Sequence, residues 1–301
     1  MLDYKLVEAV AAVLQYGGFE KAALHLNITQ SAISQRVRLL EERMSCPLLI
    51  RSTPPSATEA GLRLLQHYQQ VHTLELSLVD ELTPDAGSLF KTLSIGVNSD
   101  SLATWLLSSV EALCLQQQLL LDVQCEDEQI SLDMLRQGGV IGCISSSPEA
   151  IQGCRVEALG RMSYITVATP EYIQRHFPDG VDAKSLRSAP TVTFSIHDRL
   201  QDRYLQQYFS LPPGDYPSHQ LPSTQAFLDA ALLGMAYSLV PRIQAAEPLQ
   251  KGLLKELAPG YEVHSDLYWH YWNIRSPLLE QFSQALLQQA AKQLVPIDTA
   301  P

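Results

Sequence analysis

The chain has 301 residues, 46% of them hydrophobic, and a formal net charge of −11. This length suits two or three compact domains, and the negative charge excludes a protein that coats nucleic acid through a global positive field. No apolar run approaches the roughly 20 residues that a membrane helix needs. The early residues Asp3 and Glu8 do not fit a signal peptide. We therefore expect a cytoplasmic protein with no membrane partner.

The charge is unevenly distributed. Residues 1–64 hold seven Lys and Arg against six Asp and Glu, a net +1, and the rest of the chain holds −12. DNA binding would therefore rest on a local patch, for which the candidates are Lys21, Arg36, Arg38, Arg43 and Arg51. The five cysteines form no Cys-x-x-Cys pair, which favours buried thiols in a reducing cytosol over a redox switch.

The first 44 residues predict three helices. An amphipathic helix over residues 3–15 ends at Gly17-Gly18. Residues 19–44 then predict two helices with a tight break at Asn27-Ile28-Thr29, because polar side chains there favour turns and caps. Thr29 is a suitable N-cap for the helix over residues 30–44. Its apolar stripe, which we expect to face the core, consists of Ile33, Val37, Leu40 and Met44.

The opposite face of this helix is short, polar and free of carboxylates until Glu41. A helix with such a face, angled by a preceding short helix, fits the major groove of DNA. Arg can donate two hydrogen bonds to guanine, Gln can form two hydrogen bonds with adenine, and Ser and Thr hydroxyls can contact phosphates. The alternative is a merely solvated face. The predicted DNA-binding residues are Thr29, Gln30, Ser31, Ser34, Gln35, Arg36, Arg38 and Arg51.

A two-stranded wing follows the three helices. Residues 47–51 predict a short strand, residues 52–56 a turn, and Ala57 the return. Because the turn is Pro-rich rather than basic, phosphate contact from the wing rests on Arg51. Residues 1–58 are thus expected to form a winged helix-turn-helix domain.

A long helix is predicted from the cap at Thr58 to about Leu82. Its apolar residues recur every three or four positions, and they are Leu62, Leu65, Tyr68, Val71, Leu74, Leu78 and Leu82. The stripe either pairs with a second copy, which also suits a two-fold DNA site, or packs on its own chain. We expect residues 59–90 to be a dimerising linker helix, with residues 84–88 as a flexible connection.

From residue 91 onward, strands and helices alternate. Helical stretches include 101–116, 128–137, 198–209 and 224–233. The strand candidates are 93–97, 119–124, 140–145, 164–168, 191–194, 236–240 and 268–272. Such alternation predicts an α/β fold with mostly parallel sheets covered by helices.

Ligands of open α/β sheets bind beyond the carboxyl ends of the strands. The loop of Asn98, Ser99, Asp100 and Ser101 follows a strand and opens a helix, so either it binds an anion or Ser99 or Asp100 only caps the helix. Asp100 itself would favour an amino group. Other candidates at such ends, each of which can equally be ordinary loop, are Asp127, Ser145, Asp198, Ser223 and Thr224.

The N-terminal part contains a motif of four segments, Ala22-Ala23-x-x-Leu26-x-Ile28-Thr29-Gln30-Ser31-Ala32-Ile33-Ser34, Leu40-Glu41, Pro47-Leu48-Leu49-x-Arg51 and Thr58-Glu59-x-Gly61. This motif resembles that of the LysR-type transcriptional regulators. Segment 97–107 and residues 268–270 are similar to the subgroup that regulates arginine export.

This resemblance implies a periplasmic-binding-protein-like sensor over residues 91–301. Subdomain I would comprise about 91–162 and 267–296, subdomain II about 163–266, with crossings near 161–164 and 265–268. It also implies a homodimer or homotetramer on operator DNA, an effector that is lysine or arginine, and RNA polymerase as a further partner. The alternatives are a nucleoid or replication-origin binder with little ligand response, and a solute-binding protein whose first helices only dimerise.

Enzyme functions find no support in the motifs. The chain has no Gly-x-Ser-x-Gly, no His-Glu-x-x-His and no phosphate-binding glycine loop, and its eight histidines lack ligand spacing. We expect no catalytic residue, no cofactor and no metal.

Overall fold

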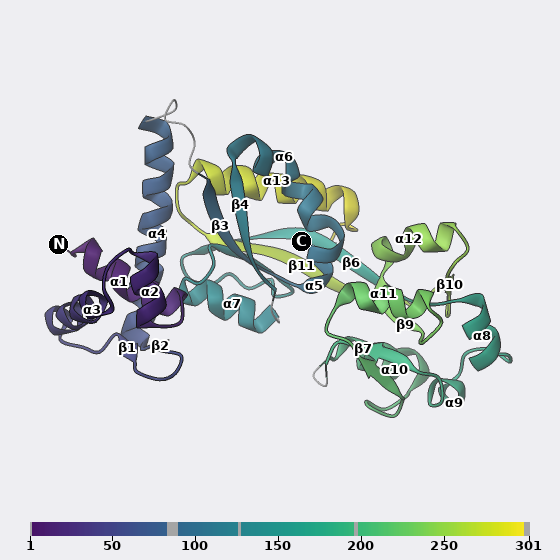
Figure 1. The fold of residues 1–301 in the computed structure, drawn as a ribbon. Coiled ribbons are helices and arrows are strands. Elements are labelled where there is room, and N and C mark those ends of the chain that lie inside the picture. Colours follow the sequence, from purple (N-terminus) through teal and green to yellow (C-terminus); the bar gives the residue numbers. More distant parts are fainter. Residues whose placement is uncertain (1, 83–89, 126–127, 196–197, 298–301) are drawn as a thin grey trace.

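The computed structural model describes residues 2–82, 90–125, 128–195 and 198–297. Figure 1 shows an elongated molecule with a helical N-terminal unit at one end and two α/β subdomains after it. The connection predicted at 84–88 and the candidate Asp127 lie outside the described residues.

The N-terminal unit has the predicted three helices and wing. Buried Val10, Ile33 and Val37 lie in its apolar core. Met44 does not share this core, because it lies in the last turn of its helix and is 43% exposed, so its predicted inward position is wrong. The elements are α1 (Tyr4–Gln15), α2 (Phe19–His25), α3 (Gln30–Met44), β1 (Leu49–Ile50) and β2 (Ser56–Ala57).

The linker helix α4 (Glu59–Leu82) begins at the predicted cap. The backbone N–H of Gly61 donates to the Thr58 hydroxyl oxygen at 3.1 Å, and that hydroxyl donates to the carbonyl of Pro47 at 2.8 Å. The first half of α4 packs on α1, whereas the second half projects beyond the unit (Figure 1). Its apolar side chains there are exposed, by 40% at Leu74, 53% at Leu78 and 71% at Leu82.

Subdomain I is built on three parallel strands, β3 (Lys91–Val97), β4 (Leu119–Cys125) and β5 (Gly142–Ser145), with β3 in the middle. Helices α6 and α13 cover one face of this sheet and α7 the other (Figure 1). The helical elements are α5 (Ser99–Ser101), the π-helical turn η1 (Leu102–Leu106), α6 (Leu107–Gln117), α7 (Glu128–Gln137) and α13 (Pro277–Gln293).

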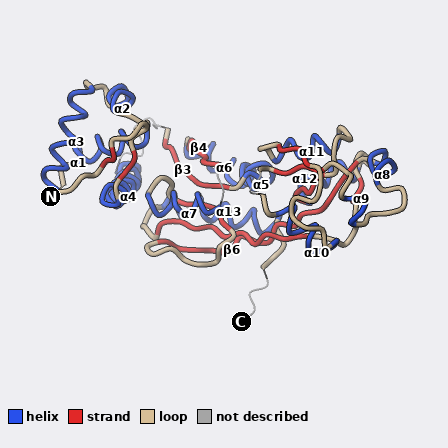
Figure 2. The backbone as a smooth tube through the Cα atoms, turned by 90° about the horizontal axis from the view of Figure 1, so that it is seen from below, coloured by secondary structure: helices blue, strands red, loops and turns tan. Residues whose placement is uncertain are grey.

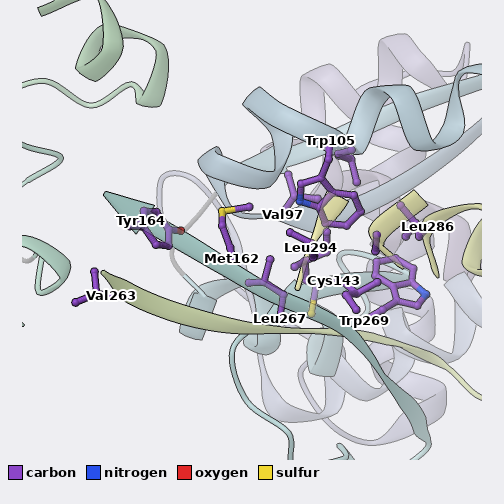
Figure 3. Packing of buried hydrophobic residues seen from close by; sticks show 14 of the residues in the cluster. Val97, Trp105, Cys143, Met162, Tyr164, Val263, Leu267, Trp269, Leu286 and Leu294 are labelled. Atoms are coloured by element: carbon purple, nitrogen blue, oxygen red, sulfur yellow. The ribbon is translucent and has the colours of Figure 1, made fainter. Parts of the chain in front are cut away.

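Large buried side chains fill the space between this sheet and its helices. Figure 3 shows Trp105, Met162 and Trp269 among them. All three are at most 1% exposed. The indole N–H of Trp269 donates to the Ser283 hydroxyl on α13 at 2.9 Å, so this core tryptophan also has its polar atom satisfied.

Two long antiparallel strands, β6 (Cys154–Ala168) and β11 (Val263–Trp272), run from subdomain I into subdomain II. Both are visible in Figure 1, and Figure 2 shows the second subdomain at the far end from α3. The predicted strands 164–168 and 268–272 are only the ends of these longer strands. Their polar parts were not recognised as strand because one face of the pair is partly exposed.

Subdomain II surrounds the far end of β6. Strands β9 and β10 pair with β6 antiparallel, while β7 and β8 form a separate parallel pair. The elements are α8 (Pro170–His176), α9 (Ala183–Leu186), β7 (Thr191–Thr193), α10 (Leu200–Phe209), β8 (Ser218–Gln220), α11 (Thr224–Leu232), β9 (Ser238–Pro241), α12 (Arg242–Gln250) and β10 (Lys255–Glu256).

The predicted architecture of a winged helix-turn-helix, a linker helix and a two-subdomain α/β sensor is confirmed. The expectation of mostly parallel sheets needs correction. In the described seven-stranded sheet, β6 pairs antiparallel with β9, β10 and β11, and β11 pairs antiparallel with β5. The reason is that β6 and β11 belong to both subdomains, and each runs in the direction opposite to the strands that pair with it.

Candidate functional sites

The first candidate site is the polar face of α3. Thr29 caps the helix, since its hydroxyl oxygen accepts from the N–H of Ala32 at 3.2 Å and also hydrogen-bonds the Ser31 hydroxyl at 2.9 Å. Arg36 is half-buried, and Arg38 pairs with Glu42 at 2.9 Å on the surface. The exposed members of the predicted set are Thr29, Gln30, Ser31, Ser34, Gln35, Arg38 and Arg51.

A groove of about 470 Å³ separates this face from the wing. Gln30 and Ser34 line it from α3, Glu20 and Lys21 from α2, and Arg51 from the wing. Two cations, one carboxylate and two hydrogen-bonding side chains therefore face one groove, and its net positive charge suits a nucleic-acid backbone. Sequence reasoning placed Lys21 in the basic patch but not among the DNA-binding residues.

The wing is held in place by Glu41 of α3. One carboxylate oxygen accepts from the backbone N–H groups of Leu48 at 2.8 Å and Leu49 at 3.2 Å. At Gly61, a Cβ atom would lie 2.0 Å from the carbonyl oxygen of Leu48, so the first turn of α4 touches the same strand. These contacts explain the Leu40-Glu41 and Thr58-Glu59-x-Gly61 motifs as the structural supports of the wing.

The second candidate site lies where the two subdomains meet. Asn98 caps the helical run that begins with α5, because its side-chain oxygen accepts from the N–H of Ser101 at 3.1 Å. Ser99 contacts the thiol of Cys125, at the end of the neighbouring strand, at 3.2 Å. The expected cap at Ser99 or Asp100 is therefore wrong, because Asn98 caps this helix and leaves the Asp100 carboxylate available to other partners.

Asp100 connects the two subdomains. Its carboxylate accepts from the phenol of Tyr164 on β6 at 2.6 Å and from the hydroxyl of Thr224 on α11 at 2.7 Å. Burial raises the pKa of this carboxyl above its ordinary value, the two hydroxyl donors oppose that change, and the negative charge of Asp198 adds to it. We call this arrangement of Asp100, Tyr164 and Thr224 the Asp100 bridge.

The other residues predicted to bind a ligand have local structural roles. Asp198 accepts from the backbone N–H groups of Phe194 at 2.9 Å and Leu200 at 3.0 Å, which fixes the start of α10. Ser223 is the N-cap of α11. The buried Ser145 hydroxyl accepts from the N–H of Ser147 at 3.1 Å. The predicted set therefore converges on Asp100 and Thr224, with the other side chains shaping the loops around them.

Sequence reasoning missed Tyr164 and Gln244 at this site, and it gave His270 only as a core residue or a possible wall of the ligand site. Tyr164 was assigned to a strand only, although its hydroxyl reaches Asp100. Gln244 on α12 donates to the carbonyl of Thr224 at 3.3 Å. His270 is fully buried and hydrogen-bonds the carbonyl of Ser147 at 2.8 Å, which holds the loop after β5. No local signal could have identified them, because their partners are far away in the sequence.

Within the ranges that the structure describes, no group of three or more His, Cys, Asp or Glu side chains is arranged to hold a metal ion. In the same ranges, none of the helices combines the length and the apolar character that crossing a membrane requires.

Family comparisons agree for both parts of the chain. Residues 4–62 match the bacterial regulatory helix-turn-helix protein, lysR family, and residues 86–291 match the LysR substrate binding domain. The HTH-type transcriptional regulator ArgP of Pseudomonas fluorescens strain Pf0-1 is 44% identical over 99% of this chain and 100% of its own. ArgP of Aeromonas salmonicida is 42% identical over 98% and 99%.

Solved structures are similar over the full length. ArgP from Mycobacterium tuberculosis is 32% identical with a TM-score of 0.84, covering 99% of this chain and 100% of its own. The full-length regulator LysG from Corynebacterium glutamicum, solved with the bound effector Arg, is 29% identical with a TM-score of 0.77, covering 98% and 100%.

Proposed function

This chain belongs to the lysR family of bacterial helix-turn-helix regulatory proteins, and from that premise we propose that it regulates transcription in response to arginine or lysine. In this proposal residues 1–58 bind DNA, residues 59–90 form the dimerising linker helix, and residues 91–301 bind the effector. Its relatives are named as regulators rather than enzymes.

The DNA-binding half of the proposal rests on the exposed polar face of α3. Its first two turns present Gln30, Ser34 and Gln35 beside the groove that Lys21 and Arg51 line. We assign base contacts to Gln35, Arg36 and Arg38, and phosphate contacts to Thr29, Ser31 and Arg51. Arg38 can leave its exposed partner Glu42 at little cost, because surface ion pairs contribute about 1 kcal/mol or less.

The effector half rests on the Asp100 bridge, which is the single observation that carries it. The bridge places a carboxylate between the two subdomains, near the N-termini of α5 and α11. A basic amino acid would bring an ammonium or guanidinium group to Asp100 or Asp198, and its carboxylate to free backbone N–H groups. The structure of LysG with bound Arg supports this class of ligand.

The proposed switch is a population shift. Tyr164 and Thr224 now donate to Asp100, so a ligand cation that takes over the carboxylate would compete with the contacts that join the subdomains. The ligand changes DNA binding only if it binds the two arrangements with different affinity. Ser99, Ser101, Ser145 and Ser223 would line the same site, with Asn98 as its cap.

The proposed assembly is a homodimer through α4. Exposed Leu74, Leu78 and Leu82 form an apolar stripe on the projecting half of this helix, which a second copy would cover. We further propose a homotetramer on operator DNA, contact with RNA polymerase, and a cytoplasmic location. Two copies of α3 would then read two half-sites.

Calorimetric titration of the full-length protein with arginine, lysine and leucine tests the effector assignment. We expect heat of binding from arginine or lysine and none from leucine. Asp100→Asn should weaken that binding at least about 10-fold, because a hydrogen bond to a charged group contributes about 1.5 kcal/mol or more. The matched control is Asp179→Asn, a change at an exposed carboxylate of subdomain II with no side-chain partner among the described residues.

Two results would refute parts of this proposal. No heat with either basic amino acid would remove the effector assignment. Specific DNA binding with the same affinity in the presence and absence of both amino acids would favour a DNA binder with little ligand response.

A further inference from the structure

We call the proposed effector site around the Asp100 bridge the effector cleft, and helix α7 extends from the edge of this site to the linker helix. It begins at Glu128, three residues after β4 ends at Cys125, and this is the sheet edge where β3 ends and Asn98 follows. Its ten residues span about 15 Å at 1.5 Å per residue. Figures 1 and 2 both place α7 between α5 and α4.

The cleft end of α7 packs tightly on the sheet. A Cβ atom at Gly96, next to the last residue of β3, would lie 3.2 Å from the Cβ of Ser131 on α7 and 3.0 Å from that of Cys143. The Ser131 hydroxyl is buried and has no hydrogen-bond partner within the described parts of the chain. Because Gly96 has no side chain, β3 lies directly against Ser131 of α7. A shift of this end of β3 therefore moves α7 with it.

The other end of α7 touches the backbone of α4. The helix ends in a Schellman motif, in which the N–H of Gly138 donates to the Leu135 carbonyl at 3.3 Å and that of Gly139 to the Met134 carbonyl at 2.8 Å. Gly138 has φ +78°, and a Cβ atom there would lie 2.5 Å from the Cα of Gln66. The two backbones are therefore in direct contact.

Gln66 lies close to the DNA-binding unit. Leu64, two residues earlier on α4, is buried in the core of that unit with Val10 and Ile33. A displacement of α4 at Gln66 is therefore passed to the helices that position α3.

From these contacts we propose that α7 is the rigid element that couples the effector cleft to the DNA-binding unit, through the contact of Gly138 with Gln66. This inference rests on the proposed function, because it needs a ligand that moves the cleft edge. α7 is packed at both ends, so it can transmit a displacement rather than absorb it.

A pair of glycine substitutions isolates the contact. Gly138→Ala adds a Cβ against α4, whereas Gly153→Ala adds one at φ +82° where no atom lies within 4 Å. Both changes impose the same kind of backbone strain, and only the first disturbs α4. All three full-length proteins are titrated with arginine and lysine, and their DNA affinity is measured with and without the amino acid that binds.

We expect both variants to bind the amino acid within about 2-fold of the wild type. The ratio of DNA affinities with and without it, which is about 5- to 150-fold in typical coupled systems, should persist in Gly153→Ala. In Gly138→Ala it should fall below about 2-fold. An unchanged ratio in Gly138→Ala would overturn the proposal, as would a wild type that binds the amino acid without any change in DNA affinity.

Two further measurements keep the test decisive. If Gly138→Ala does not fold, Gly138→Asn and Gly153→Asn replace the pair, because Asn tolerates positive φ better than other non-glycine residues. If the wild type binds neither amino acid, the proposed function fails, and hydrogen exchange of residues 62–70 then tests the contact alone. Faster exchange there in the Gly138 variant than in the Gly153 variant supports the contact of α7 with α4, and equal exchange overturns the proposal.

Discussion

Replacing Thr224 by Val tests whether the Asp100 bridge holds the subdomains together. Val keeps the size of Thr but removes the hydroxyl that donates to Asp100 at 2.7 Å. A hydrogen bond to a charged group contributes about 1.5–3 kcal/mol, and we take the lower end because Asp100 is half-buried. A loss of about 1.5 kcal/mol shifts the balance between bridged and open arrangements about 10-fold. It should lower the melting temperature by about 3–6 °C.

The assay is thermal unfolding of the full-length protein in a double-mutant cycle. Thr224→Val should lower the melting temperature in the wild-type background and have little effect in an Asp100→Ala background, because its partner is already gone. Thr92→Val, at an exposed position of β3, is the control. Equal effects of Thr224→Val in both backgrounds would refute the bridge as a stabilising contact.

Three other predictions concern pH, assembly and the cap of α3. Burial raises the pKa of the Asp100 carboxyl above its ordinary value of 3.8, so the folded protein binds the carboxyl proton more tightly than the unfolded chain does. The protonated carboxyl therefore stabilises the folded state at low pH. This stability is lost as pH rises through the pKa of Asp100 in the folded protein. Asp100→Asn should therefore gain stability relative to the wild type as pH rises from about 3.8 through the raised pKa of the folded state, measured by urea unfolding, and a falling difference would contradict this sign. Leu78→Glu should dissociate the dimer in sedimentation experiments while Glu75→Gln should not, and an intact dimer would place the interface elsewhere. Thr29→Ala should destabilise the N-terminal unit by about 1 kcal/mol through loss of the cap, and an unchanged unfolding midpoint would argue against that role.

Local patterns were enough to predict the DNA-binding unit. The Thr29 cap, the break before it and the stripe of Ile33, Val37 and Leu40 depend on neighbours within a few residues. Met44 belongs to the same periodic stripe, yet it lies in the last helical turn, where the core no longer covers it. Periodicity predicts which face turns inward, but it does not say where the core ends.

The proposed effector site could be predicted only in part. The loop after β3 identified Asp100 as a candidate because polar residues follow an apolar strand, and Thr224 was a candidate because it begins a predicted helix. Their contact joins residues 124 positions apart, and Tyr164 reaches Asp100 from a third segment. Such contacts depend on how the crossing strands orient the subdomains, which no short-range pattern specifies. The contact of Gly138 with Gln66 was not predicted for the same reason.

Fluorescence anisotropy with duplex DNA tests the central claim, that the exposed face of α3 reads DNA. The probe is a duplex selected by the full-length protein from a random-sequence pool. We predict binding that weakens steeply with salt, a loss of about 5- to 150-fold in Arg38→Ala from about 1–3 kcal/mol per base contact, and wild-type affinity in the control Arg199→Ala, an exposed position of subdomain II. Failure of the wild type to bind any duplex at low salt, or an unchanged affinity in Arg38→Ala, would contradict it.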